Sequence, residues 1–336
     1  MKRKSLYFVG REQVSLQTEE LADPAPGEVR VASVCSVVSA GTELLLYKGE
    51  APADLAADAT LPALSGTLAY PCKYGYCMVG AVEELGKGVD SSWRGRQVFA
   101  FNPHETAFIA RVEELLPLPA GCSQPDAAFL PAMETAINLI LDGEPRLGER
   151  VAILGQGVIG LLTTALLARH PLQTLLTFDG YPPRRALSLQ FGAQTSLDPQ
   201  GPKVEANHVL GSGGADLVYE LTGNPATLDL ALDLVGDHGR VVVGSWYGAR
   251  RAAVNLGGRF HRGRIKLISS QVSHIEPSLR GRWDQARRFA AAWHWLAEIQ
   301  PSRLASRTVP FEQANSAYEM LAKQPDKYLT ILFTYN

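Results

Sequence analysis

A glycine-rich turn near the middle of the chain places the strongest constraint on its fold. Residues 151–154 form a short apolar run, typical of a strand buried on both faces, and an apolar-rich helix is expected over residues 161–169. Between them lie Gly155, Gln156, Gly157, Val158, Ile159 and Gly160. In such a turn the first glycine permits the sharp bend, the second lets the backbone approach a diphosphate, and the third lets the helix pack close to the strand. The helix N-terminus would then face the diphosphate of a dinucleotide.

A carboxylate at the expected distance supports the same interpretation. A second buried strand, residues 174–178, ends on Asp179, nineteen positions after Gly160, where a dinucleotide-binding domain presents an acid to the adenosine ribose. A loop aspartate after ordinary turn glycines is the alternative. Asp179 favours NAD over NADP, because a 2′-phosphate would meet a carboxylate. Arg184 and Arg185 keep NADP open, since either could pair with a phosphate or simply begin a solvated helix.

Composition limits the classes of protein that remain. The chain has 336 residues, too many for one ordinary domain, with 46% hydrophobic and 20% charged residues. A net charge of −2 gives no electrostatic reason to expect nucleic acid or an anionic membrane as a partner. No apolar run approaches the length of a membrane span or a signal peptide. The four cysteines have no CxxC spacing, so we expect reduced thiols and a cytoplasmic protein.

The order of predicted elements indicates one domain inserted in another. Short strand candidates dominate residues 5–119, helix begins near residue 126, and alternating strands and helices follow the glycine-rich turn. The last strand candidate, residues 328–335, most naturally rejoins the first part of the chain. We therefore expect an α/β protein in which a β-rich domain of residues 1–125 and 272–336 contains a doubly wound, parallel-sheet, dinucleotide-binding domain of residues 126–271.

Several motifs resemble those of the medium-chain dehydrogenase/reductase family, and the resemblance covers nearly the whole chain. Residues 41–43 (Gly-Thr-Glu) resemble the family's Cys-Gly-Thr-Asp turn, and residues 75–82 occupy the place of its Gly-His-Glu-x-x-Gly-x-Val motif. Residues 95–98 resemble Gly-Asp-Arg-Val, and residues 310–321 fit the family's C-terminal region. The resemblance implies a Rossmann domain, a GroES-like catalytic domain, a small-molecule substrate with a CH–OH group and a homodimer. Thr222, Gly244 and Ser245 join the expected cofactor-binding residues.

The departures from the family pattern concern its catalytic zinc. Ala40 stands where the first cysteine ligand would be, and Tyr76 stands where the histidine would be. No ligand aligns at residues 130–133, and the four-cysteine structural lobe is absent. We therefore expect no zinc. A rearranged metal site made from Cys72, Cys77 and His104 is the alternative.

Some of these segments are most similar to one zinc-lacking branch of the family. Residues 39–43, 70–76 and 244–247 resemble the 3-hydroxyethyl (bacterio)chlorophyllide dehydrogenases. That resemblance supports oxidation of a secondary alcohol, or the reverse reaction, and does not establish a pigment substrate.

Without a metal, side chains must manage the hydroxyl proton during hydride transfer. Thr42 aligns with the family's proton relay, although its hydroxyl could instead bond local backbone. Tyr76 would point its phenol at the reacting oxygen, or be a packed aromatic. Lys73 and His104 are candidate proton shuttles, with solvated loop residues as the alternative.

The substrate cleft is expected to include Tyr47, Glu134, Trp246 and Tyr247. The favoured function is a zinc-independent, NAD(P)-dependent dehydrogenase of a secondary alcohol. A quinone- or enoyl-type C=C reductase using NADPH and Tyr47 is one alternative. A dinucleotide-binding protein without catalytic activity is another.

Overall fold

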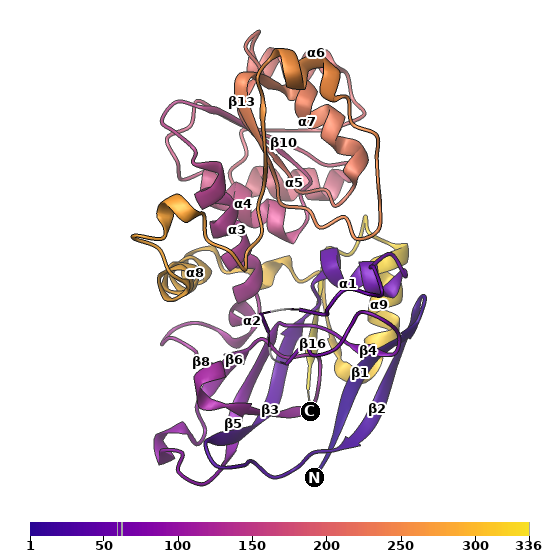
Figure 1. The fold of residues 1–336 in the computed structure, drawn as a ribbon, viewed down its shortest axis with the longest axis vertical. Helices are drawn as coiled ribbons and strands as arrows, with labels where there is room; N and C mark the ends of the chain where they lie inside the picture. The colour runs from indigo at the N-terminus through magenta and orange to yellow at the C-terminus, as the bar shows by residue number, and fades with distance from the viewer. Residues whose placement is uncertain (59, 62, 336) are drawn as a thin grey trace. The chain divides into compact units, whose positions relative to one another are not determined.

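The computed structural model describes residues 1–58, 60–61 and 63–335, which separate into two compact units (Figure 1). Unit 1 comprises Met1–Pro131 and Trp293–Asn336, and unit 2 comprises Ala132–Ala292. The domain boundaries expected from the sequence, after residues 125 and 271, stay a prediction. Among the described residues, no helix combines the length and the apolar character that crossing a bilayer requires.

Unit 2 is a doubly wound α/β domain, as expected. Its parallel sheet has the strand order β11-β10-β9-β12-β13-β14. The strands are β9 (Arg150–Leu154), β10 (Thr174–Phe178), β11 (Thr195–Leu197), β12 (Ala215–Glu220), β13 (Val235–Val243) and β14 (Lys266–Ser269). Helices α4 (Val158–Leu167), α5 (Pro182–Gln190), α6 (Lys203–Leu210) and α7 (Leu228–Leu234) connect them. The strand order reverses between β9 and β12, which is where such sheets bind ligands, outside the carboxyl ends of the strands.

Burial explains why the sequence forms this sheet. Every residue of β10 is buried, and β9 is buried from Val151 onward, as parallel strands covered on both faces must be. Helix α4 follows the glycine-rich turn directly and is buried from Gly160 to Leu167. The strand, the turn and the helix therefore occur where the apolar pattern predicts them.

Unit 1 is β-rich and is built from both ends of the chain. One sheet has the order β2-β1-β4, and another has the order β15-β16-β3-β5-β6-β8, with β7 also paired to β3. Its strands are β1 (Lys2–Gly10), β2 (Gln13–Glu20), β3 (Glu28–Val37), β4 (Cys72–Lys73), β5 (Met78–Leu85), β6 (Gln97–Ala100), β7 (Ala107–Arg111), β8 (Leu116–Pro117), β15 (Arg307–Pro310) and β16 (Ile331–Thr334). Because β16 pairs antiparallel with β3, the prediction that the C-terminal strand rejoins the N-terminal part is confirmed.

Helices α1 (Ala40–Tyr47), α2 (Gln124–Ala127) and α9 (Ala314–Lys323) belong to unit 1, whereas α3 (Leu130–Gly143) and α8 (Gln285–Ile299) cross the division between the units. The surface excursion expected near residues 51–64 includes residues 59 and 62, which lie outside the described residues. In the part that is described, Leu64 is buried. Aromatic rings fill the centre of unit 1, where Tyr47 of α1 stacks on Tyr318 of α9 with ring centroids 5.6 Å apart.

Candidate functional site

The glycine-rich turn of unit 2 has the geometry that a diphosphate requires. Gly155 has a φ of +92°, and a Cβ atom there would lie 2.6 Å from the Leu221 carbonyl oxygen. A Cβ at Gly160 would lie 2.0 Å from the Gly155 carbonyl oxygen, so only glycine lets α4 pack this closely. A Cβ at Gly157, in contrast, would meet no atom within 4 Å. Gly157 therefore leaves open space beside the unpaired N–H groups that begin α4, which fits the phosphates of a dinucleotide.

Asp179 is tied to this turn. Its carboxylate is buried and accepts hydrogen bonds from the backbone N–H groups of Gln156 and Tyr181, both at 2.8 Å. Arg185 does not contact the Asp179 carboxylate. Its Nη1 donates to the Asp179 backbone carbonyl oxygen at 2.7 Å and pairs with the Asp198 carboxylate at 3.3 Å. Arg184 lies over the Tyr181 ring and approaches the Asp179 carboxylate to 4.0 Å. Of the two arginines, Arg184 is therefore the one placed beside the acid.

The carboxyl ends of β12 and β13 bring together Thr222, Gly244, Ser245 and Tyr247. The Ser245 hydroxyl accepts the Gly223 N–H at 2.8 Å, and the Tyr247 hydroxyl donates to Glu220 at 2.6 Å. A Cβ at Gly244 would lie 2.6 Å from the Leu139 side chain. Trp246 is 39% exposed.

Glu220 is a residue that the sequence reasoning missed. The sequence signal for Glu220 is an acid at the end of a buried strand. A buried acid needs hydrogen-bond donors, and ligands bind at the carboxyl ends of such strands. Burial and the Glu220 charge raise the pKa of Tyr247. The Tyr247 phenol is therefore neutral near pH 7.

In unit 1 the structure brings Tyr76 and Thr42 together. The Tyr76 hydroxyl lies 2.6 Å from the Ser39 hydroxyl and donates to the Thr42 hydroxyl at 3.3 Å. All three side chains are half-buried. Burial, with the nearby Cys77, raises the pKa of Tyr76. The phenol is therefore a neutral hydrogen-bond donor near pH 7.

His104 lies in a separate, fully buried cluster. Its Nε2 lies 3.1 Å from the Glu43 carboxylate, and its Nδ1 lies 2.7 Å from the Ser36 hydroxyl. Glu43 also accepts the Ser39 N–H at 2.7 Å and a hydrogen bond from Tyr318. Nε2 therefore contacts α1 through Glu43, whereas Nδ1 contacts β3 through Ser36. His104 is fully buried, and both of its ring nitrogens have hydrogen-bond partners.

Lys73 lies in an ion-pair network with residues of β2 and of the segment between β6 and β7. Its ammonium group is 2.7 Å from Glu19 and 2.8 Å from Glu105, and Arg3 contacts both of these acids. Burial by itself would raise the pKa of Glu19, but hydrogen bonds from Lys73, Tyr7 and Ser5 lower it to about 2. The Lys73 charge is therefore directed at this network.

Two of the residues expected in the substrate cleft are buried. Tyr47 is 4% exposed and belongs to the aromatic core of unit 1. Glu134 is 4% exposed and pairs with Arg288 at 2.8 Å, and Arg288 also donates to Asn138 at 2.7 Å. Burial raises the pKa of Glu134 even though Arg288 opposes that shift. Both side chains therefore contribute to packing.

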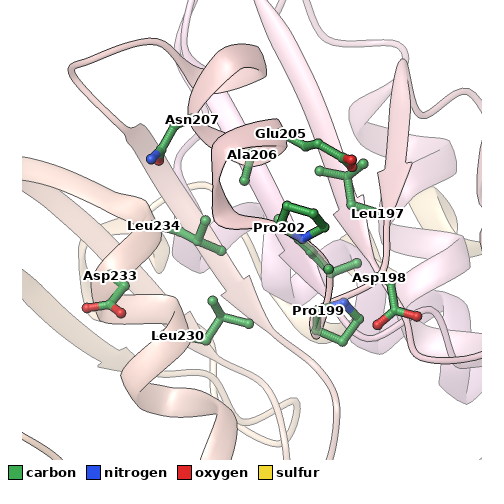
Figure 2. Close-up of a pocket in the computed structure, with 12 residues that line it drawn as sticks. Leu197, Asp198, Pro199, Pro202, Glu205, Ala206, Asn207, Leu230, Asp233 and Leu234 are labelled. Atoms are coloured by element: carbon green, nitrogen blue, oxygen red, sulfur yellow. The ribbon is translucent and has the colours of Figure 1, made fainter.

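A small hollow in unit 2 is separate from these groups (Figure 2). Leu230 and Leu234 line one side, Ala206 lies above, and Pro199 and Pro202 lie across from the two leucines. Its volume is about 40 Å³, far less than small-molecule sites usually have. None of the expected site residues lines it.

Among the described residues, no three His, Cys, Asp or Glu side chains are grouped as metal ligands would be. Burial raises the pKa of Cys72 to about 11 and that of Cys77 well above its usual range. Cys72, Cys77 and His104 do not form such a group with one another in the described part of the chain.

Comparison with known proteins adds independent information. Residues 158–292 match a family model described as zinc-binding dehydrogenase. D-guloside 3-dehydrogenase of Escherichia coli is 24% identical over 269 residues, which cover 78% of this chain and 77% of that protein. L-threonine 3-dehydrogenase of Bacillus licheniformis is 30% identical over 127 residues, covering 37% of this chain and 36% of that protein.

Solved structures share the fold over the whole chain. One is an alcohol dehydrogenase from E. coli in complex with NADH, with a TM-score of 0.80, 18% identity and 99% of both chains covered. Another is 2R,3R-butanediol dehydrogenase from Bacillus subtilis, with a TM-score of 0.80, 18% identity, and 99% of this chain and 100% of that chain covered. These similarities establish the fold, a Rossmann domain together with a GroES-like domain.

Proposed function

We propose that this chain transfers a hydride between a nicotinamide cofactor and a secondary alcohol or ketone. The family model and the relatives support placing it among the zinc-type alcohol dehydrogenase-like proteins of the medium-chain dehydrogenase/reductase superfamily. The relatives named above are dehydrogenases, which supports an NAD(P)-dependent oxidoreductase acting on CH–OH. The observation that carries the proposal is the open space at Gly157 beside the start of α4, followed by the buried acid Asp179. Together they provide for the diphosphate and the adenosine ribose.

We propose NAD as the preferred cofactor. The Asp179 carboxylate would accept hydrogen bonds from ribose hydroxyls and repel a 2′-phosphate. Arg184, 4.0 Å from that carboxylate, leaves weaker use of NADP open. Thr222, Gly244 and Ser245, at the carboxyl ends of β12 and β13, belong to the same proposed cofactor site.

The proposed reaction uses no zinc. The matched region, residues 158–292, lies within unit 2, so the family match does not bear on Ala40 and Tyr76, which stand at the ligand positions of the resemblance. A neutral Tyr76 phenol that donates to a ketone oxygen would polarise it in place of a Lewis acid. The nicotinamide, when bound, supplies or accepts the hydride. Thr42 would act as a relay through the hydrogen bond that joins the two hydroxyls: in ketone reduction it would pass its proton to the phenolate and take one from water, and in alcohol oxidation the two transfers would run in reverse.

The same proposal extends to the substrate class, the branch of the family, the oligomeric state and the location. The substrate is a small molecule with a secondary hydroxyl, and the zinc-lacking branch of the family is the group in which this chain would fall. We propose a homodimer, which size-exclusion chromatography with light scattering would test, and a cytoplasmic location.

The first experiment measures cofactor and metal in the purified protein. Fluorescence titration with NADH and NADPH should show saturable binding with the lower Kd for NADH, and metal analysis should show much less than one zinc per chain. No binding of either nucleotide would overturn the cofactor role. One equivalent of tightly bound zinc would overturn the zinc-free reaction.

The second experiment tests the proton path with a panel of secondary alcohols and polyols. Tyr76→Phe and Thr42→Ala should each lower kcat by roughly 100-fold, the typical value of a positioned proton donor, with the Kd for NADH changed less than twofold. Tyr74→Phe is the matched control, because Tyr74 contacts the Tyr76 ring with centroids 6.0 Å apart but its phenol is not part of the hydroxyl cluster. Full activity of both test variants would refute the relay.

A further inference from the structure

Glu220 is a completely buried carboxylate at the edge of the sheet where ligands bind. It ends β12 with 0% exposure. One oxygen accepts hydrogen bonds from the Thr222 N–H at 2.9 Å, from the Thr222 hydroxyl and from the Thr227 hydroxyl at 2.9 Å. The other oxygen accepts the Tyr247 hydroxyl at 2.6 Å. Each of these groups can donate, which is what an ionised carboxylate needs when it is removed from water.

The strand order shows which part of a dinucleotide Glu220 would lie near. The glycine-rich turn and Asp179 follow β9 and β10, so the adenosine half belongs to the part of the sheet formed by β9, β10 and β11. The second mononucleotide half of a doubly wound sheet lies beyond the reversal, over β12, β13 and β14. Glu220 ends β12 and Tyr247 follows β13, so both belong to the nicotinamide half.

The charge of Glu220 is not cancelled by the groups that bind it. Its partners Thr222, Thr227 and Tyr247 are hydroxyl donors that carry no positive charge. The nicotinamide ring is cationic in the oxidised cofactor and neutral in the reduced cofactor. A fixed negative charge on that side of the sheet therefore acts differently on the two oxidation states.

We propose that Glu220 discriminates between the two oxidation states of the cofactor, favouring the oxidised form through its buried negative charge. This inference rests on the proposed function, because it assumes that the chain binds a nicotinamide cofactor. Its consequence is that the bound reduced cofactor becomes a stronger hydride donor, which favours carbonyl reduction on the protein. Glu220 acts through its field and through the loops it holds, so it is a positioning residue.

The test compares two affinities. The Kd for NADH is measured by fluorescence titration and the Kd for NAD⁺ by displacement of NADH, in the wild-type protein and in Glu220→Gln. For a separation of about 12 Å between the carboxylate and the nicotinamide ring, and an effective dielectric of about 20, a single buried charge changes such a ratio by roughly tenfold. We therefore expect the ratio Kd(NAD⁺)/Kd(NADH) to rise about tenfold in Glu220→Gln. A merely structural role would weaken both forms equally and leave the ratio unchanged, which would overturn the inference.

Two controls separate charge from structure. Tyr247→Phe keeps the charge and removes one donor, so the ratio should stay within about twofold of wild type. Glu149→Gln removes a carboxylate at the amino end of β9, where it pairs with Arg240 at 2.7 Å. Because Glu220 lies at the carboxyl ends of the strands, this variant should also leave the ratio unchanged. A tenfold rise in either control would refute the assignment to Glu220.

The experiment also separates this inference from the proposed function. If the wild-type protein binds neither nucleotide, the proposed function fails; if it binds both and the ratio is insensitive to Glu220→Gln, only the inference fails. Should Glu220→Gln not fold, the double variant Glu220→Met/Tyr247→Phe replaces the carboxylate and its phenol donor with apolar groups of similar size, and the Thr222 and Thr227 hydroxyls keep their mutual hydrogen bond at 3.0 Å. The same tenfold rise is expected there, and an unchanged ratio would overturn the inference.

Discussion

Two glycines in one turn should respond to alanine in opposite ways. At Gly160 an added Cβ would lie 2.0 Å from the Gly155 carbonyl oxygen, which is backbone and cannot rotate away, so α4 must shift from β9. Overpacking of this kind costs about 2 kcal/mol, which corresponds to a fall in Tm of roughly 4–8 °C for a domain of this size. At Gly157 the φ of −70° suits alanine and the added Cβ meets nothing within 4 Å. Gly157→Ala should therefore fold normally but fill the space intended for the diphosphate.

Thermal unfolding and NADH fluorescence titration on the same samples distinguish the two effects. We expect Gly157→Ala to keep its Tm within about 3 °C of wild type, since alanine at a helix N-cap costs about 1 kcal/mol, while its Kd for NADH rises at least tenfold. Gly160→Ala should lose Tm first, with weaker binding as a consequence. Wild-type NADH affinity in Gly157→Ala would refute the assignment of the open space to the diphosphate. Wild-type Tm in Gly160→Ala would refute the packing argument.

Three further outcomes follow from charged side chains. Asp179→Ser should raise the Kd for NADH about tenfold and lower that for NADPH, and an unchanged preference in paired titrations would exclude Asp179 as the ribose ligand. Because the pKa of Glu19 falls from 4.5 to about 2 on folding, its stabilisation of about 3 kcal/mol is complete above pH 4.5 and disappears toward pH 2. Urea midpoints measured across that range should fall steeply in wild type and less in Glu19→Gln; equal slopes would contradict this. Arg288→Met leaves Glu134 buried without its cation and should lower the free energy of unfolding by about 3 kcal/mol. The double variant Glu134→Leu/Arg288→Met should recover most of that loss, because no buried charge remains. A double variant as unstable as Arg288→Met would argue against the pair.

Unit 2 was largely predictable because its signals are local. The buried strands β9 and β10, the glycines between them and the acid that follows are neighbours in the chain, and their spacing alone indicates a strand, a tight turn and a helix. The return of β16 to β3 was predictable from the position of the last apolar run. The dinucleotide-type pattern thus lies within residues 150–179, a short and continuous part of the chain.

The polar partners were not predictable in the same way. His104 and Lys73 were both expected to serve as proton shuttles, yet His104 meets Glu43 and Lys73 meets Glu19 and Glu105, residues from different elements. Tyr47 was expected in a cleft, but Tyr318, near the other end of the chain, stacks on its ring. These partners are separated by about 30 to 270 positions in the chain. Contacts between such distant residues produce no periodic pattern in the sequence, so neither partner can be identified from its own neighbours.

The sequence by itself determined that the chain contains a glycine-rich turn between a buried strand and a helix, and where that turn lies, because glycine conformation and strand burial are properties of neighbouring residues. Only the tertiary structure decided which of the polar residues meet: Tyr76 with Ser39 and Thr42, and Tyr247 with Glu220. The reason is physical. A buried hydroxyl or carboxylate must find a donor or acceptor wherever the fold supplies one, and the fold draws those groups from distant segments.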